Sequence, residues 1–255
     1  MSSEVPDFRP QFEITSTAAA FNAARRMMDA LRPPFDLQQF PFLELARPYI
    51  QLAQSCERFT KQVRDKAEQL GALGWTVPLD TTLSDTLDLL ERSTSAEAAD
   101  ATFTEFYAAD GGAACTSLKE NLLSQTDIAP WREDLSTACA RLADDDYRSC
   151  VNNLLPVMDG FATAKLREPR FHNKGARDRF FARKVDGETS LLNQALWLSV
   201  KAFVARLFEQ IDFGDQAKLS ERLNRHARLH GRGAYRPTRA DCFRLLQALH
   251  TISYL

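Results

Sequence analysis

The chain is short of the features that mark secreted, membrane-spanning and metal-binding proteins. Its five cysteines among 255 residues are scattered and never spaced as Cys-x-x-Cys, which argues against a disulfide framework and a zinc knuckle. The longest apolar stretch, Leu191 to Ile211, is interrupted by polar and charged residues, whereas a membrane span needs about 20 mostly apolar ones. Met1 to Arg25 has acidic residues and prolines where a signal peptide would be basic and then apolar. We therefore expect a cytoplasmic protein with buried thiols.

Strand patterns are lacking as well. No useful length of sequence alternates apolar and polar residues, and no repeat of about 20 to 50 residues is evident. Apolar residues instead recur at steps of three and four, as on an amphipathic helix. The clearest such series is Leu52, Cys56, Phe59, Val63, Ala67 and Leu70. The sequence predicts an all-α, multi-helix bundle, with this stripe facing a core or, alternatively, a coiled-coil partner.

Helix-start and helix-stop residues divide the chain into segments. Residues 1–14 form a predicted mobile lead-in, and a first helix runs from Thr15 to the Pro33-Pro34 pair. Further helices are expected from about Tyr49 to Gly71 and Gly74, and over Thr82 to Arg92, Ala96 to Ala109, Thr116 to Ser124, Pro130 to Ala143, Glu188 to Ile211, Lys218 to His230 and Thr238 to Tyr254. Another helix follows Asp144-Asp145-Asp146 and is expected to be interrupted by Pro156 and Gly160. The three aspartates suit a helix start; a Mg²⁺ site is the alternative.

Charge is distributed unevenly along the chain. Residues 1–160 hold 14 Lys and Arg against 25 Asp and Glu, whereas residues 161–255 hold 18 against 9. Such asymmetry lets the basic part attract a polyanion, or lets the two parts or two subunits bind each other. We predict an acidic helical N-terminal region over residues 15–143 and a basic helical domain over residues 144–255.

Cations and aromatic residues alternate in a basic connector over residues 161–187. Positive charge attracts phosphates and flat rings stack on unpaired bases, so this composition suits single-stranded nucleic acid. The aromatic members are Phe171, His172, Phe180 and Phe181. The nucleic-acid-binding candidates are Lys174, Arg177, Arg179, Arg183 and Lys184, together with Arg232 further along. A solvated loop explains the same composition, and the sequence leaves the two interpretations open.

The segment from Asn224 to Gly231 holds two of the four histidines. Arg225 and His230 are five positions apart, which corresponds to a rotation of about 140° on a straight helix, so they converge only if the helix ends near His230. Gly231 and Gly233 make that end plausible. A histidine can transfer protons near neutral pH, and an arginine grips phosphate with two donors.

This segment resembles the Arg-x-x-x-x-His signature of the HEPN superfamily, small all-helical domains of many toxin and phage-defence ribonucleases. Arg225 and His230 hold the signature positions, His226 follows the arginine, and Gly231 follows the histidine. The aromatic Tyr235 comes later than in the family pattern. The resemblance covers the last third of the chain and implies a C-terminal HEPN-like helical domain.

The resemblance also implies an activity. The ribose 2′-hydroxyl would attack the adjacent phosphate, with His230 transferring a proton and Arg225 steadying the developing charge. The expected function is therefore a metal-independent endoribonuclease of toxin or defence type, with no cofactor, acting on RNA at a homodimeric site. An antitoxin or regulatory protein is a further expected partner. His226, Asn224, Arg228 and Asp159 are supporting candidates.

Other interpretations compete with catalysis. Arg225 could pair with an acidic residue of a neighbouring helix while His230 caps a helix end. His226 and His230 could be metal ligands, but the Glu of a His-Glu-x-x-His motif is absent, and only His172, Asp241, Cys242 or His250 could complete the site, so no metal site is predicted. The alternative function is a non-catalytic helical module that binds a partner protein or nucleic acid through its basic C-terminal face.

Overall fold

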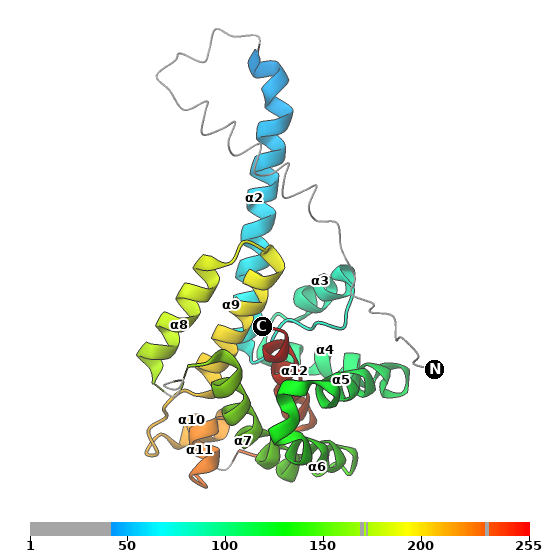
Figure 1. The fold of residues 1–255 in the computed structure, drawn as a ribbon, viewed down its shortest axis with the longest axis vertical. Coiled ribbons are helices and arrows are strands. Elements are labelled where there is room, and N and C mark those ends of the chain that lie inside the picture. The colour runs from blue at the N-terminus through cyan, green and yellow to red at the C-terminus, as the bar shows by residue number, and fades with distance from the viewer. Residues whose placement is uncertain (1–41, 169–170, 172, 233–234) are drawn as a thin grey trace, which may run out of the picture. The chain divides into compact units, whose positions relative to one another are not determined.

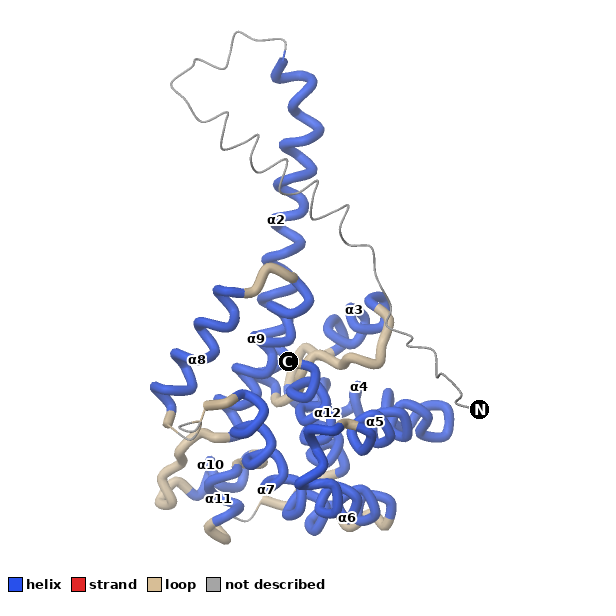
Figure 2. Tube along the Cα trace, in the orientation of Figure 1, coloured by secondary structure: helices blue, strands red, loops and turns tan. Residues whose placement is uncertain are grey.

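The computed structural model describes residues 42–168, 171, 173–232 and 235–255. All regular elements in these ranges are helices, which confirms the predicted all-α bundle (Figures 1 and 2). None of the helices in these ranges has the length and apolar character needed to cross a bilayer. The predicted lead-in over residues 1–14 and the predicted helix from Thr15 lie outside the described residues, as does His172.

The helices follow one another with short connections. Their bounds are α2 (Phe42–Leu73), α3 (Leu83–Arg92), α4 (Ala96–Ala108), the 3₁₀ turn η2 (Ala109–Gly112), α5 (Ala113–Ser124), the 3₁₀ turn η3 (Thr126–Trp131), α6 (Arg132–Ala143), α7 (Tyr147–Leu166), α8 (Lys174–Gly187), α9 (Leu191–Leu207), α10 (Gln216–Glu221), α11 (Arg225–Leu229) and α12 (Arg239–Tyr254).

The chain divides into two compact units, Met1–Gln62 and Val63–Leu255. The structure therefore places the division within α2, and no boundary falls at the predicted position between residues 143 and 144. The physical reason is packing across that position: α6 lies against α7, and α12 contacts α4 and α5 as well as α7. Residues from the acidic part after Val63 and residues from the basic part thus share one core.

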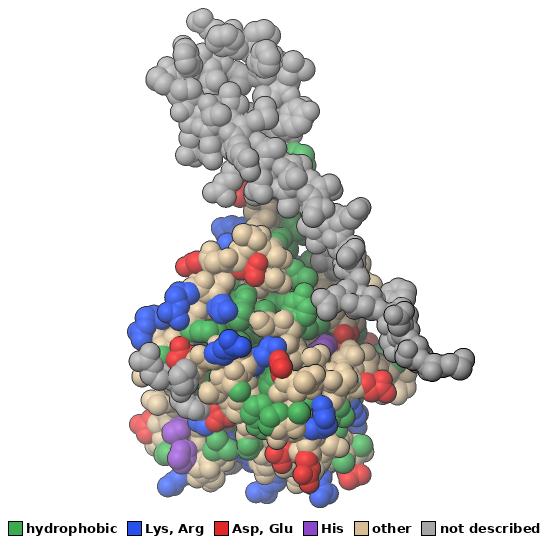
Figure 3. Space-filling model, viewed as in Figure 1, with side chains coloured by type: hydrophobic (Ala, Val, Ile, Leu, Met, Phe, Trp, Pro, Cys, Tyr) green, Lys and Arg blue, Asp and Glu red, His purple; other side chains and the backbone are tan. Residues whose placement is uncertain are grey.

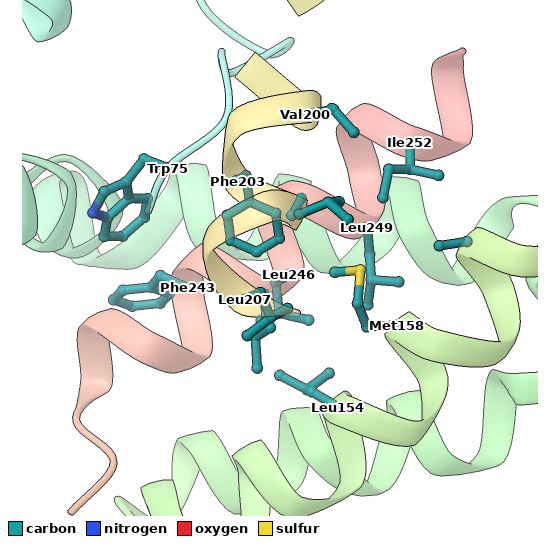
Figure 4. Close-up of a cluster of buried hydrophobic side chains, with 14 of the residues drawn as sticks. Trp75, Leu154, Met158, Val200, Phe203, Leu207, Phe243, Leu246, Leu249 and Ile252 are labelled. Atoms are coloured by element: carbon teal, nitrogen blue, oxygen red, sulfur yellow. The ribbon is translucent and has the colours of Figure 1, made fainter. Parts of the chain in front are cut away.

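The core of the Val63–Leu255 unit is built around α9 and α12. Their side chains meet those of α7 in Figure 4, where Leu154, Met158, Phe203, Leu207 and Leu246 are among the buried residues shown. The sequence predicted a central role for α9, and its apolar stripe is buried. α12 is buried along nearly its whole length, as expected for a helix surrounded by others. Four of the five cysteines are buried free thiols, and Cys56 is half-buried.

Helix starts agree closely with the sequence expectations. Thr82 and Thr238 each form a capping box with an aspartate three residues later. Asp146 caps α7 by accepting a hydrogen bond of 3.1 Å from the Ser149 N–H. Its neighbour Asp145 binds Tyr147 and Arg239. The three consecutive aspartates therefore lie at a helix start, as expected, and include a capping residue and an ion-pair partner of Arg239.

α7 differs from the prediction, because it continues through Pro156 and Gly160. Pro156 lies on the exposed side of the helix, where water can reach the backbone groups that a proline leaves unpaired. At Gly160 an added Cβ would lie 2.6 Å from Trp131 Nε1. The glycine is needed for close approach of the indole ring, and it does not interrupt the helix.

α2 also differs at both ends. It begins by Phe42, ahead of the expected start near Tyr49, and ends at Leu73. Gly74 has φ +99° and follows the end of the helix, as predicted. Gly71 instead lies inside α2 at a close crossing with α9, where an added Cβ would be 2.3 Å from the Ser199 carbonyl oxygen.

Candidate functional site

The helix predicted over Lys218 to His230 is divided in two. α10 ends at Glu221, Arg222 is extended with φ −157° and ψ 165°, and α11 begins at Arg225. Arg222 forms an ion pair with Glu209. The break lies before both Arg225 and His230, which belong to α11 and its C-terminal cap. The rotation of about 140° expected between these two residues therefore still applies.

Asn224 is the residue that starts α11. Its Oδ1 accepts a hydrogen bond of 2.9 Å from the Ala227 N–H, and its Nδ2 donates one of 2.9 Å to the Glu209 carbonyl. The side chain is buried. Both ends of the amide are engaged, so Asn224 is a structural capping residue.

Arg225 is directed toward α7. Its guanidinium donates to the Asp159 carboxylate and lies over the Phe208 ring, 5.4 Å from the centroid. The side chains of Arg225 and Asp159 are only 23% and 19% exposed. Two of the predicted site residues, Arg225 and Asp159, thus come together as an ion pair between α11 and α7.

His230 follows the last residue of α11 and is exposed, with Gly231 after it at φ +64°. The predicted helix end at this histidine is confirmed. Its ring lies 4.7 Å from that of His226 and 5.7 Å from that of Phe213, centroid to centroid. The ring contacts of His230 are with His226 and Phe213, whereas Arg225 contacts Asp159 and Phe208. The two signature residues therefore take part in different clusters.

His226 lies between these two clusters. Its ring stacks on Phe213 with centroids 4.8 Å apart and an interplanar angle of 6°. Burial lowers the pKa of the imidazole, and the charges of His230 and Arg225 lower it further. His226 is therefore held mainly as a neutral imidazole near pH 7.

The two remaining arginines of this segment differ in exposure. Arg228 is half-buried, and its Nε donates a hydrogen bond of 2.8 Å to Asn152 Oδ1 on α7. Burial lowers the pKa of Arg228, and the charge of Arg148 lowers it further. Arg232 is exposed, and its guanidinium lies 5.5 Å from the centroid of Phe213. Of the two, Arg232 is the more accessible to a ligand.

The basic connector contains a regular helix, α8, capped by the Asn173 side chain. We name its exposed cations the α8 cation surface, which consists of Lys174, Arg179, Arg183 and Lys184. In Figure 3, Lys and Arg side chains gather over α8, and histidine side chains lie on the same face over α10 and α11.

Arg177 does not belong to this surface. It is 3% exposed, lies 6.0 Å from the centroid of Phe208, and donates to the Phe171 carbonyl at 3.5 Å. Burial lowers the pKa of its guanidinium. Arg177 was predicted to contact nucleic acid, but it lies in the interior and is not accessible to such a ligand.

The aromatic side chains predicted to stack on bases are also part of the core. Phe171, Phe180 and Phe181 are buried and make edge-to-face contacts with one another. Phe180 and Phe181 also pack against Trp197 of α9. α8 uses its apolar face for packing, so its exposed face offers charge without aromatic platforms.

Asp241, Cys242 and His250, which were also considered as metal ligands, have other partners than the histidine pair. Asp241 forms an ion pair with Arg244, Cys242 contacts the Tyr147 carbonyl, and His250 lies 3.5 Å from Asp80. Within the described ranges, no group of three or more His, Cys, Asp and Glu side chains is placed to hold a metal ion.

Two cavities of about 10 Å³ each lie elsewhere in the Val63–Leu255 unit. One is lined by residues that include Asp80, Tyr107 and His250, and the other by residues that include Arg206 and Arg244. Each has room for about one water molecule. Neither lining includes Arg225 or His230.

Comparisons of the chain with protein families, curated proteins and solved structures gave no match.

Proposed function

We propose that the protein is a helical module that binds single-stranded RNA through the α8 cation surface. The observation that supports this proposal is that the four cations are exposed and form no ion pair with the described residues. Some cations of other helices are paired, for example Lys165 with Asp127 and Lys201 with Glu68, whereas α8 carries four exposed cations on one helix. Unpaired cations on one helix are available to phosphates.

The geometry of α8 suits a flexible polyanion. Arg179 and Arg183 are four positions apart and therefore lie on the same side of the helix. Lys184 extends over the Phe180 and Trp197 rings, with its ammonium 5.7 and 5.3 Å from their centroids, which keeps its charged end at the surface. Because the aromatic side chains of α8 are buried, phosphate contacts dominate and little base preference is expected.

The salt dependence of RNA binding tests this proposal. If all four cations contact phosphates, log K falls against log salt with a slope of about −2.8, using about −0.7 per contact on a single strand. Affinity for a fluorescent single-stranded RNA then drops about 50-fold between 50 and 200 mM salt. Removing two contacts with Arg179→Gln and Arg183→Gln reduces the slope to about −1.4 and the drop to about sevenfold.

A matched control removes the same charge elsewhere. Arg141 and Arg148 are exposed on α6 and α7, and the double variant Arg141→Gln, Arg148→Gln should keep the wild-type slope. Equal slopes for the two double variants, or no RNA binding at 50 mM salt, would contradict the proposal. A partner protein would then be the ligand to seek for the basic face.

A second candidate function is the metal-independent endoribonuclease suggested by the HEPN resemblance. The observation that favours it is the exposed imidazole of His230 at the end of α11, where a phosphodiester can reach it. One copy supplies one His230, so the second proton-transfer group would come from the same residue of a second copy in a homodimer. Arg225 would steady the phosphate charge only after exchanging its contact with Asp159 for one with the phosphate.

Cleavage is measured separately from binding. End-labelled RNA is incubated with purified protein in EDTA at low salt, and the products are examined for 2′,3′-cyclic phosphate ends. Wild type cleaves under this proposal, whereas His230→Ala does not, although it still binds RNA through α8. Intact RNA with the wild-type protein would contradict the nuclease and leave the binding function in place.

A further inference from the structure

α11 brings a pair of imidazoles together, the half-buried His226 within the helix and the exposed His230 directly after it. His226 and His230 are four positions apart, and their ring centroids are 4.7 Å apart with an interplanar angle of 68°. Phe213 stacks face to face with His226 and contacts His230 edge to face. Stacking occupies a face of the His226 ring, whereas the nitrogen lone pairs of an imidazole lie in the plane of the ring.

The distance between the rings matches that of two imidazoles bound to one ion. With metal–nitrogen bonds of about 2.0–2.1 Å, each ring centroid lies about 3.2 Å from the metal. For ligand angles of about 90–109°, the two centroids are then about 4.5–5.2 Å apart. The observed 4.7 Å lies inside this range, so chelation requires no change in the separation of the rings.

We propose that His226 and His230 chelate one divalent transition-metal ion, with water molecules completing its coordination. Imidazole favours Zn²⁺, Cu²⁺ and Ni²⁺ over Mg²⁺ and Ca²⁺, which bind oxygen ligands. The described residues provide no third histidine, cysteine or carboxylate at this position. The site therefore corresponds to an exchangeable surface ion and not to a closed structural centre.

The electrostatic surroundings limit the affinity. Arg225 lies close enough to lower the pKa of His226, and Arg232 lies over Phe213 on the same cluster. Both cations repel a metal dication, so the affinity expected of the site is lower than that of the same pair of imidazoles without neighbouring charges. Because the histidine pair is separate from the α8 cation surface, metal binding does not depend on RNA binding.

Calorimetric titration of the full chain with Ni²⁺ or Zn²⁺ at pH 7.5 tests the site. Wild type is expected to bind one ion, and His226→Ala or His230→Ala to weaken binding at least about tenfold, because either change turns a chelate into a single-ligand contact. Arg232→Gln is the matched control, since it alters the same cluster without removing a ligand and should bind at least as tightly. Wild-type affinity in either alanine variant would overturn the proposal.

A measurement on the unaltered protein guards against variants that fold poorly. Paramagnetic Cu²⁺ added below stoichiometry should broaden the imidazole NMR signals of His226 and His230 before that of His250, which is 8% exposed and next to Asp80. Equal broadening of all histidine signals, or earlier broadening of His250, would overturn the proposal. Neither result bears on the salt dependence of RNA binding, so the two proposals fail separately.

Discussion

The ion pair between Arg225 and Asp159 gives the sharpest test of what the signature arginine does. The residues are 66 positions apart and join α11 to α7, with side chains 23% and 19% exposed. Exposed ion pairs contribute about 0.2–1 kcal/mol, whereas breaking a fully buried one costs about 3–5 kcal/mol. We expect a coupling free energy between these limits, about 1–3 kcal/mol.

A double-mutant cycle isolates this coupling. Arg225→Ala also removes the contact with the Phe208 ring, but that loss occurs with and without Asp159, so it cancels in the cycle. Urea unfolding of wild type, Arg225→Ala, Asp159→Ala and the double variant provides the four free energies. At about 3 °C per kcal/mol for a unit of this size, the coupling corresponds to about 3–9 °C in Tm.

The outcome separates two roles for Arg225. Arg179→Ala on the α8 cation surface is the control, and it should change stability by less than about 0.5 kcal/mol because the side chain is exposed. A coupling below about 0.5 kcal/mol would refute the structural role of the pair. Arg225 would then be available to a phosphate, and its loss should affect RNA cleavage.

Two further predictions concern the core. Gly71→Ala should destabilise the protein by about 1–3 kcal/mol in thermal or urea unfolding, because the new methyl would lie 2.3 Å from the Ser199 carbonyl oxygen. Gly175→Ala is the control: its nearest neighbours are side-chain atoms at 3.5 Å, so it should stabilise by up to about 1 kcal/mol. The reverse order of stabilities would contradict the close crossing of α2 and α9. Burial lowers the pKa of His250, and the charge of Asp80 partly offsets this. The unfolded state therefore binds more protons below about pH 6.5, and the free energy of unfolding should fall as pH decreases through that value. His250→Gln should flatten the dependence of the unfolding free energy on pH between about pH 5.5 and 7.5, and an unchanged dependence would show that this histidine is not responsible.

Local signals account for the parts of the fold that could be predicted. Helix starts were expected at Thr82 and Thr238, and each of these residues caps its helix together with an aspartate three residues later. The end of α11 at His230 was likewise signalled by Gly231. Helix boundaries depend on residues a few positions apart, and for that reason the all-α fold followed from the sequence.

The same local signals misled where a residue was chosen for a distant partner. Gly71 and Gly160 resemble helix breakers in sequence, but each provides room for a side chain or backbone from another helix. Arg177 and Phe181 alternate with exposed cations, yet both are buried against the core. A one-dimensional pattern shows composition, and it does not show which face of a helix is covered.

The sequence by itself therefore determined the all-α class, most of the helix starts and the concentration of positive charge after residue 160. It did not indicate α8 or the division between α10 and α11. Tertiary structure decided which of those charges are available: Arg225 is bound to Asp159, Arg177 is buried, and Arg179 and Arg183 are exposed. It also placed His226 and His230 together on Phe213. The reason is that helix formation depends on neighbours within one turn, whereas the accessibility of a charge depends on residues brought together from distant parts of the chain.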